Sequence, residues 1–457
     1  MKRKVGPARV LAVILSATFA LTNVVTASAT SGDDAANLSS SQDEAAQEVS
    51  VEAEESTDES GTAASEAAEK VSEDAPLFEK VNPEDEDYRD VKDAFESEVA
   101  ELPIEEKDPE EQTRVIIVME GDSVLDKGYD TENLADNDAA MNLSEQIIAE
   151  QEETVEKIEA EALDGETLDV NYNLSIITNA VSADVAYKDI ASIVDVDGVE
   201  AVYVAQQYDP LVETANPETV TAGEMVGSYT SWATGYTGAG TRIAIIDTGI
   251  DSDHPSFDEG AFKAHLEETA EANGKSVEDY NLLTAEEIAA VLPNLNVAQR
   301  NSGVTADQLY VNEKIGFAFN YVDRNLDITH DHDSQGDHGT HVSGIATANY
   351  YVPNESSETG YSRQDIGVVG VAPDAQLITM KVFGTKGGAY SDDYMAAIED
   401  AILLKADVVN LSLGSSAAGY SADSEAYIND VFNKLQGTST VVSISAGNAG
   451  RWSDDST

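Results

Sequence analysis

Apolar and polar positions follow a regular order between residues 113 and 207. "RVIIVME" at 114–120 predicts a strand, and the spacing of apolar residues over 142–163 predicts a helix, with Asn142 as its candidate cap. Two strands within 168–185, a short helix at 187–196 and a strand at 199–206 complete the pattern. This β-α-β-β-α-β order predicts a ferredoxin-like α+β domain over 113–207, a fold that indicates no function by itself.

From residue 241 the pattern changes to nearly continuous apolar runs separated by helical segments. The runs are "RIAIID" (242–247), "GFAFNYV" (316–322), "AQLITMKVF" (375–383), "DVVNLSL" (407–413) and "TVVSISA" (440–446), with helices predicted at 394–406 and 424–437. Strands this apolar are typical of a parallel sheet covered on both faces. Residues 225–457 therefore predict an open α/β domain, joined to the first domain by a polar linker at 208–224.

The first part of the chain has no such periodicity. Basic residues within 1–9, an apolar run at 10–25 and "ASA" at 27–29 form the charged, apolar and small-residue order of a signal peptide, predicted as 1–29. Residues 30–112 form a low-complexity acidic leader, which predicts disorder because it cannot bury enough apolar surface. We expect a secreted chain with no membrane insertion after signal cleavage; an N-terminal anchor would need a longer apolar run.

Charge and cysteine content narrow the classes of partner. The formal net charge is −63, from 88 acidic and 25 basic side chains, and such an excess repels nucleic-acid phosphates and anionic lipid. The chain has no cysteine, which excludes a disulfide framework, a thiolate nucleophile and a thiolate metal site.

Three polar residues stand where α/β sheets gather functional groups, at strand ends and helix starts. Asp247 ends the strand at 242–247, His338 precedes the small residues that open a helix at 339–348, and Asn448 closes "SISAGNAG". Each also has an ordinary structural interpretation, as a turn carboxylate, a buried hydrogen-bonded histidine or a turn-forming asparagine. An amide at Asn448 could instead donate to a developing oxyanion.

Five segments, in their order along the chain, resemble the subtilisin-like serine peptidases, or subtilases, over about residues 225–457. They are "IIDTGIDSDHP" (245–255), "HGTHVSG" (338–344), "GVAPDAQLITMKVFG" (370–384), "DVVNLSLGS" (407–415) and "SISAGNAG" (443–450). The resemblance implies that Asp247 orients an imidazole, that His338 is the general base and that Asn448 helps to bind the oxyanion. It implies a subtilisin-like three-layer parallel sheet and a secreted endopeptidase that acts on polypeptides and requires no cofactor.

The same resemblance assigns roles outside the triad. Ser412, Leu413 and Gly414 are expected to line the substrate-binding pocket. The ferredoxin-like domain is expected to be a propeptide, a folding aid and inhibitor that is the peptidase's own partner, cleaved somewhere in about 205–225.

The nucleophile of the family is missing from the residues before Thr457. A Gly-Thr-Ser-Met-Ala stretch is expected after Asn448 and does not occur there. "GTST" at 437–440 contains Ser439, but Ser439 precedes Asn448 and leads into a strand, so we reject it as nucleophile. We expect the amino-terminal part of a larger peptidase, with a truncated sheet and no activity alone. If the gene ends at 457, a non-catalytic secreted binding protein or a pseudopeptidase becomes the leading interpretation.

Two departures from compact bacterial subtilases affect these expectations. The spacing between Asp247 and His338 is enlarged by an acidic, helix-rich insertion at about 258–312, which is similar to the large cell-envelope proteinases of Gram-positive bacteria, the lactocepin type. This insertion either borders the substrate cleft or is a loop on the surface with no role in the site. Ser256 stands where many subtilases have a calcium-binding aspartate, so we do not expect the family's usual calcium site here. Other acidic loops could still bind calcium. The expected location is secreted or associated with a Gram-positive cell envelope.

Two rival enzyme classes each lack a residue pattern that they need. An aspartic peptidase would need a second Asp-Thr-Gly besides 247–249, and none exists. A zinc-dependent hydrolase could use His330, His332, His338 and His341, but no HExxH-type helix accompanies them.

Overall fold

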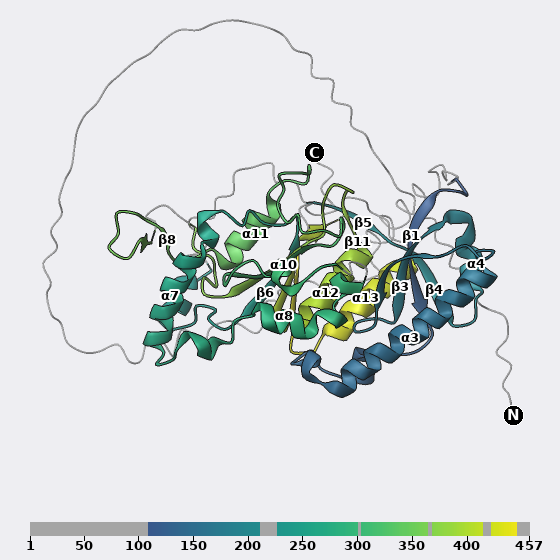
Figure 1. The fold of residues 1–457 in the computed structure, drawn as a ribbon, viewed down its shortest axis with the longest axis horizontal. Helices are drawn as coiled ribbons and strands as arrows, with labels where there is room; N and C mark the ends of the chain where they lie inside the picture. Colours follow the sequence, from purple (N-terminus) through teal and green to yellow (C-terminus); the bar gives the residue numbers. More distant parts are fainter. Residues whose placement is uncertain (1–107, 211–225, 300–302, 364–367, 415–421, 446–457) are drawn as a thin grey trace, which may run out of the picture. The chain divides into compact units, whose positions relative to one another are not determined.

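The computed structural model of the chain describes residues 108–210, 226–299, 303–363, 368–414 and 422–445 (Figure 1). These residues fall in one compact unit, Glu106–Thr457. The predicted signal peptide (1–29), most of the acidic leader (30–112) and most of the linker (208–224) lie outside the described residues. Among the helices that are described, none has the length and apolar content needed to cross a bilayer.

The first part of the unit is an antiparallel sheet of four strands: β1 (Gln112–Met119), β2 (Asp169–Leu174), β3 (Ala180–Ala186) and β4 (Val199–Val204). Their order is β2-β3-β1-β4, and β1 pairs antiparallel with both β3 and β4. Helices α3 (Asp138–Glu161) and α4 (Ile190–Val194) connect β1 to β2 and β3 to β4 (Figure 1). This is the ferredoxin-like arrangement; below it is called the four-stranded domain.

Alternate side chains of β1 enter two different cores. Val115 and Ile117 pack with Ile158 of α3, whereas Ile116 joins the large cluster that includes α12 of the parallel-sheet domain. Successive side chains of a strand point to opposite faces. Both faces of β1 are therefore covered, which explains why its second part, Val115–Met119, is apolar throughout.

The helix cap predicted at Asn142 is wrong. Helix α3 begins at Asp138, and the side chain of Asn137 accepts hydrogen bonds from the amides of Ala139 (3.1 Å) and Ala140 (3.3 Å). Asn142 lies inside the helix. Asn137 satisfies amides that have no partner within the helix, which is the usual work of a capping residue.

The second part is built on a five-stranded sheet with the order β14-β12-β6-β10-β7, in which every neighbouring pair is parallel. Its strands are β6 (Arg242–Asp247), β7 (Ile315–Asn320), β10 (Gln376–Lys381), β12 (Val408–Leu411) and β14 (Val441–Ile444). The structure thus confirms the predicted parallel α/β sheet, and every residue of β6, β7 and β10 is buried.

Helices cover both faces of this sheet. Ala244 and Ile246 of β6 belong to the cluster of α12 (Ser391–Leu403), whereas Ile243 and Ile245 pack with residues of α11 (His338–Thr347). Helix α13 (Ala422–Leu435) follows α12, and α6 (Ser228–Ala233) precedes β6. The short strands β8 (Val352–Pro353) and β9 (Tyr361–Ser362) pair with each other. The result is a three-layer α/β domain.

The predicted insertion at 258–312 is helical, as its composition indicates. It contains α7 (Glu259–Ala272), α8 (Ala285–Val291), α9 (Asn296–Gln299) and α10 (Ala306–Leu309), with 3-10 turns between them. Helix α9 contacts both β2 and α12. Part of the insertion therefore packs between the two domains and is more than a surface excursion.

Candidate active site

Asp247 is the last residue of β6 and is only 1% exposed. Its Oδ1 atom accepts a hydrogen bond of 2.7 Å from the amide of Thr248. Its Oδ2 atom is buried and accepts none from the part of the chain that the structure describes. The carboxylate is therefore held at the carboxyl end of a central strand in a nearly dry setting.

His338 is the first residue of α11, and its Nδ1 atom lies 2.8 Å from Oδ1 of Asp247. The imidazole is 12% exposed. The structure brings these two sequence-predicted residues together, at the point where a strand end meets a helix start. With Nδ1–H donated to the carboxylate, the Nε2 atom is the nitrogen that can accept a proton.

Two glycines that sequence reasoning did not single out allow this approach. A Cβ atom on Gly339 would lie 2.3 Å from the carbonyl oxygen of Gly249, and the Gly339 amide donates to Oγ1 of Thr248 at 2.8 Å. Gly249 has φ of +104°, and a Cβ there would lie 2.1 Å from the carbonyl oxygen of Ile328. Only residues without a side chain fit this contact, so "DTG" and "HG" form one packed unit.

A buried ion pair next to the site was also missed from the sequence. Lys381, paired with Asp247 in the β10–β6 register, places its Nζ 2.8 Å from Oδ2 of Asp333 and 2.5 Å from the carbonyl oxygen of Thr248. The two charged side chains are 1% and 3% exposed. Lys381 therefore ties the loop before α11 to the turn after β6.

The other candidate histidines of the zinc hypothesis have separate surroundings in the described structure. His332 is exposed and its Nδ1 atom lies 2.8 Å from Oδ2 of Asp327. His341 lies one turn into α11. Among the residues that the structure describes, no group of three or more His, Asp or Glu side chains is arranged to hold a metal ion.

Ser439 lies at the other end of the sheet. It comes just before β14, which runs parallel to the other strands, and its amide donates to Oδ1 of Asp130 at 3.2 Å. Asp247 is at a strand end and Ser439 at a strand start, so the structure does not bring them together. Asn448 lies outside the described residues.

The predicted substrate-binding segment holds an extended strand of the same chain. β5 (Gln207–Pro210) pairs antiparallel with β13 (Leu413–Gly414) on one side and with β11 (Ala389–Tyr390) on the other. Leu413 is the register partner of Pro210, and Gly414 that of Asp209. Ser412 precedes β13, and its Oγ accepts from the side-chain amide of Asn410 at 2.9 Å. β5 is thus an added strand between the edges of β11 and β13, and the space between these two edges is called the groove below.

The fit of β5 in the groove depends on one further glycine and one aromatic contact. A Cβ on Gly388 would lie 1.9 Å from the carbonyl oxygen of Tyr208. The Tyr208 ring meets the Tyr394 ring of α12 edge to face, with centroids 5.6 Å apart. The groove therefore contacts both the backbone and a side chain of the bound strand.

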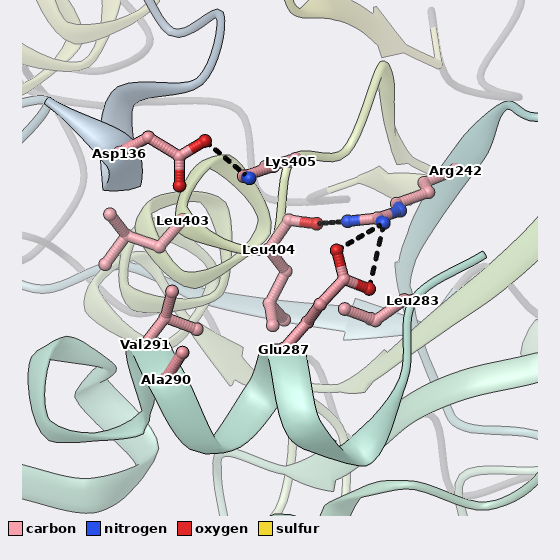
Figure 2. A pocket seen from close by; sticks show the side chains of 9 residues that line it. All are labelled: Asp136, Arg242, Leu283, Glu287, Ala290, Val291, Leu403, Leu404 and Lys405. Atoms are coloured by element: carbon pink, nitrogen blue, oxygen red, sulfur yellow. Dashed lines mark hydrogen bonds and ion pairs between the residues drawn. The ribbon is translucent and has the colours of Figure 1, made fainter. Parts of the chain in front are cut away.

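A small pocket lies away from these groups, where Arg242 begins β6 (Figure 2). The Arg242 guanidinium donates to the carbonyl oxygen of Leu404 at 3.0 Å and pairs with Glu287 of α8 at 3.2 Å. Lys405 pairs with Asp136 of the four-stranded domain at 2.7 Å. The charged groups in the wall pair with one another, and Asp247 is at the opposite end of the same strand, so the pocket is not part of the candidate active site.

Comparisons with known proteins identify similar sequences. Residues 238–457 match the model of the subtilase family of peptidases. The PI-type proteinase of Lactococcus lactis subsp. cremoris is 30% identical over 279 residues, which cover 60% of this chain and 12% of that protein. The C5a peptidase of Streptococcus pyogenes serotype M3 is 32% identical over 190 residues, 40% of this chain and 13% of that protein. The chain thus spans about one eighth of the relatives it matches.

Among solved structures, the epidermin leader peptide processing serine protease (EpiP) of Staphylococcus aureus matches 74% of this chain and 61% of its own. The sequence identity is 16% and the TM-score is 0.37.

Proposed function

Residues 238–457 are a domain of the subtilase family, and from this premise we propose that the chain belongs to a secreted serine endopeptidase that cuts polypeptides. In the proposed mechanism His338 is the general base that removes a proton from a serine hydroxyl. Asp247 holds the imidazole in the required tautomer and stabilises the imidazolium that forms. The observation that carries the proposal is the 2.8 Å contact between Nδ1 of His338 and Oδ1 of Asp247.

Two further parts of the mechanism are proposed from the sequence. Asn448 would donate its side-chain amide to the oxyanion of the tetrahedral intermediate. No Gly-Thr-Ser-Met-Ala stretch follows Asn448 within the 457 residues, so the proposal requires a serine from polypeptide beyond Thr457. It therefore predicts that the 457-residue chain alone does not hydrolyse peptides. The chemistry needs no metal or organic cofactor.

We propose that the four-stranded domain is a propeptide that inhibits the peptidase through β5. The support is that Gln207–Pro210 occupies the groove between β11 and β13 as an added strand. A substrate would pair with the same two strand edges, so it cannot bind while β5 stays there. Cleavage within about 205–225 would convert this tethered strand into a product that can leave.

The relatives support a location at the cell surface. The lactococcal and streptococcal proteins are a proteinase and a peptidase of Gram-positive bacteria. We propose that this chain is likewise secreted or associated with the cell envelope of such a bacterium.

Covalent labelling by a fluorophosphonate, which reacts with activated serines, tests the function. We expect no labelling of the 457-residue chain, and labelling of the longer polypeptide encoded when the coding sequence is extended past Thr457. Replacing His338 by Ala should abolish that labelling, whereas replacing the exposed His332 by Ala should not. Labelling of the 457-residue chain, or labelling that survives His338→Ala, would contradict the mechanism.

A further inference from the structure

Helix α12 places an unusual number of acids where the four-stranded domain packs on it. Asp392, Asp393 and Glu399 are between 0% and 2% exposed. The Glu399 carboxylate accepts hydrogen bonds from the amides of Ile176 (2.7 Å) and Ile177 (2.9 Å), in the turn between β2 and β3. Carboxylates are rarely buried so completely unless cations accompany them.

The cations that the described residues bring to this interface are too few for the acids. Arg114 of β1 lies 3.4 Å from Asp184 of β3, 3.8 Å from Asp392 and 3.5 Å from Asp393. Three carboxylates thus surround one guanidinium, two of them from α12 and one from the four-stranded domain. A further cation, Arg324, has its guanidinium over the ring of Tyr172, 5.4 Å from the centroid.

Apart from Arg114, the described groups that contact Asp392 and Asp393 are uncharged hydroxyls and a backbone amide, which can hydrogen-bond to a protonated carboxyl as well as to a carboxylate. Asp393 accepts from the Tyr172 hydroxyl at 3.2 Å and from the Tyr390 amide at 3.1 Å. Asp392 contacts the hydroxyl of Ser182 through Oδ2, while its Oδ1 atom is buried without a hydrogen-bond partner among the described residues. A buried carboxylate oxygen with no donor favours the neutral acid.

The electrostatic effect follows from burial and like charge. Burial, together with the neighbouring charge of Asp392, raises the pKa of Asp393 to about 7, although Arg114 and Arg324 oppose the change. Burial also raises the pKa of Asp392, against the charge of Arg114 and the Ser182 hydroxyl. Burial raises the pKa of Glu399 to about 7, against the amides of 175–177 and Asn296. Once the domains separate, water reaches these carboxyls and their pKa values return to the ordinary range.

We propose that the α12 surface is a proton-controlled docking surface for the four-stranded domain, which binds more tightly in acid and loosens as the solution becomes neutral to alkaline. The sign follows from linkage: a group with a higher pKa in the docked state takes up a proton on docking, so docking weakens as pH rises. The stabilisation is complete below about pH 4 and is lost as pH rises to about 7. The inference concerns docking alone and holds whether or not the chain is a peptidase.

Hydrogen exchange of the full chain measures the docking. The amides of Ile176 and Ile177 bond across the interface to Glu399, so their protection, corrected for the intrinsic exchange rate, reports separation of the domains. Between pH 5.5 and pH 8 we expect this protection to fall on the order of tenfold or more. The amides of Ala244–Ile246 in β6 serve as the reference for global stability.

Asp393→Asn tests the cause, because the amide keeps the size and removes the charge. Its Oδ1 can accept from Tyr390, and its NH2 can donate to the Tyr172 oxygen, whose own proton has a second acceptor, the carbonyl oxygen of Tyr321, at 2.9 Å. We expect this variant to lose less protection with rising pH and to be better protected than the wild type at pH 8. Asp184→Asn removes the half-exposed carboxylate that pairs with Arg114, and it should likewise reduce the loss of protection with rising pH. Glu152→Gln, on the exposed face of α3, should behave as the wild type.

Protection in the wild type that does not change with pH, after correction, would overturn the proposal. So would the same fall in Asp393→Asn and Asp184→Asn as in Glu152→Gln. A general loss of protection in β6 would identify a variant that fails to fold. If one of Asp393→Asn and Asp184→Asn fails in this way, the other variant tests the proposal.

Discussion

The Nδ1 atom of His338 and the Oδ1 atom of Asp247 lie 2.8 Å apart although ninety-one positions separate the two residues in the chain. The contact joins the end of β6 to the start of α11. It depends on the turn "DTG" after the strand and on the glycine after the histidine.

Replacing Asp247 by Asn should leave the fold intact and remove most of the activity. An amide at this position can hold the wrong tautomer of His338, so we expect kcat to fall by about 10⁴-fold in the polypeptide that carries the nucleophile. Asp253→Asn, in an exposed turn residue, is the matched control. The measurement is hydrolysis of a peptide substrate, and a loss below about tenfold in Asp247→Asn would contradict the assigned role.

Replacing Gly339 by Ala should destabilise the domain, because its Cβ would lie 2.3 Å from the Gly249 oxygen. We expect a loss of about 1–3 kcal/mol in the free energy of unfolding. Gly344, in the same helix, has open space within 4 Å of the position that a Cβ would take, so Gly344→Ala should stabilise by about 0.5–1 kcal/mol. Urea unfolding of both variants checks the difference; equal effects would argue against the close approach.

The Lys381–Asp333 pair provides a test of buried charge. Lys381→Met leaves the carboxylate of Asp333 buried without its cation, and we expect a destabilisation of about 3–5 kcal/mol. The double variant Lys381→Met, Asp333→Leu should recover much of that loss, since it removes both charges. Thermal unfolding at neutral pH gives both values. A double variant less stable than Lys381→Met would show that the pair contributes something other than mutual neutralisation.

A methyl group at position 388 should displace β5 from its groove. In Gly388→Ala the Cβ would lie 1.9 Å from the carbonyl oxygen of Tyr208. We expect faster hydrogen exchange and faster proteolysis across Gln207–Pro210, with the four-stranded sheet unchanged. Gly344→Ala, at a helical glycine with open space within 4 Å of its Cβ position, is the control for a glycine replacement remote from the groove. Unchanged exchange at Tyr208 in Gly388→Ala would contradict the strand addition.

Lys314 should make stability depend on pH in the alkaline range. Its side chain is fully buried, its Nζ donates to the carbonyl oxygens of Pro373 and Ala375 at 2.9 Å, and burial lowers its pKa to about 7. The unfolded chain therefore binds one more proton than the folded chain between about pH 7 and 10.5, and stability rises with pH there, by about 1.4 kcal/mol per unit. Urea unfolding at pH 8, 9 and 9.5, above the range in which the buried acids of α12 titrate, should show this slope in the wild type and its absence in Lys314→Met.

The strands of the parallel sheet were predictable because a strand buried on both faces must be apolar along its whole length. The same logic located Asp247 at a strand end and His338 at a helix start. The expectation that they contact each other came from the resemblance to subtilases, and it agrees with the rule that functional groups meet at the carboxyl edge of such a sheet.

Other features were not predictable because they depend on what the fold brings close. No sequence pattern around Lys381 predicts that it pairs with Asp333. Likewise, the need for glycine at 339 becomes evident only from its close contact with Gly249 in the fold. Residues 208–210, assigned to a linker from their polar composition, are part of a strand because two edges of another domain lie beside them. Asn137 became the cap of α3 because the helix extends one turn further than its apolar spacing indicates.

The strand in the groove is covalently attached to the domain that it fills. A tethered segment competes at an effective concentration that for short linkers reaches the millimolar range. A free peptide added to the intact chain must compete against that local concentration, so its apparent affinity will be far below the intrinsic affinity of the groove. Ligand screening on this polypeptide will thus measure mainly how easily β5 dissociates from the groove. The intrinsic affinity of the groove can be measured only after the chain is cleaved and β5 has been removed.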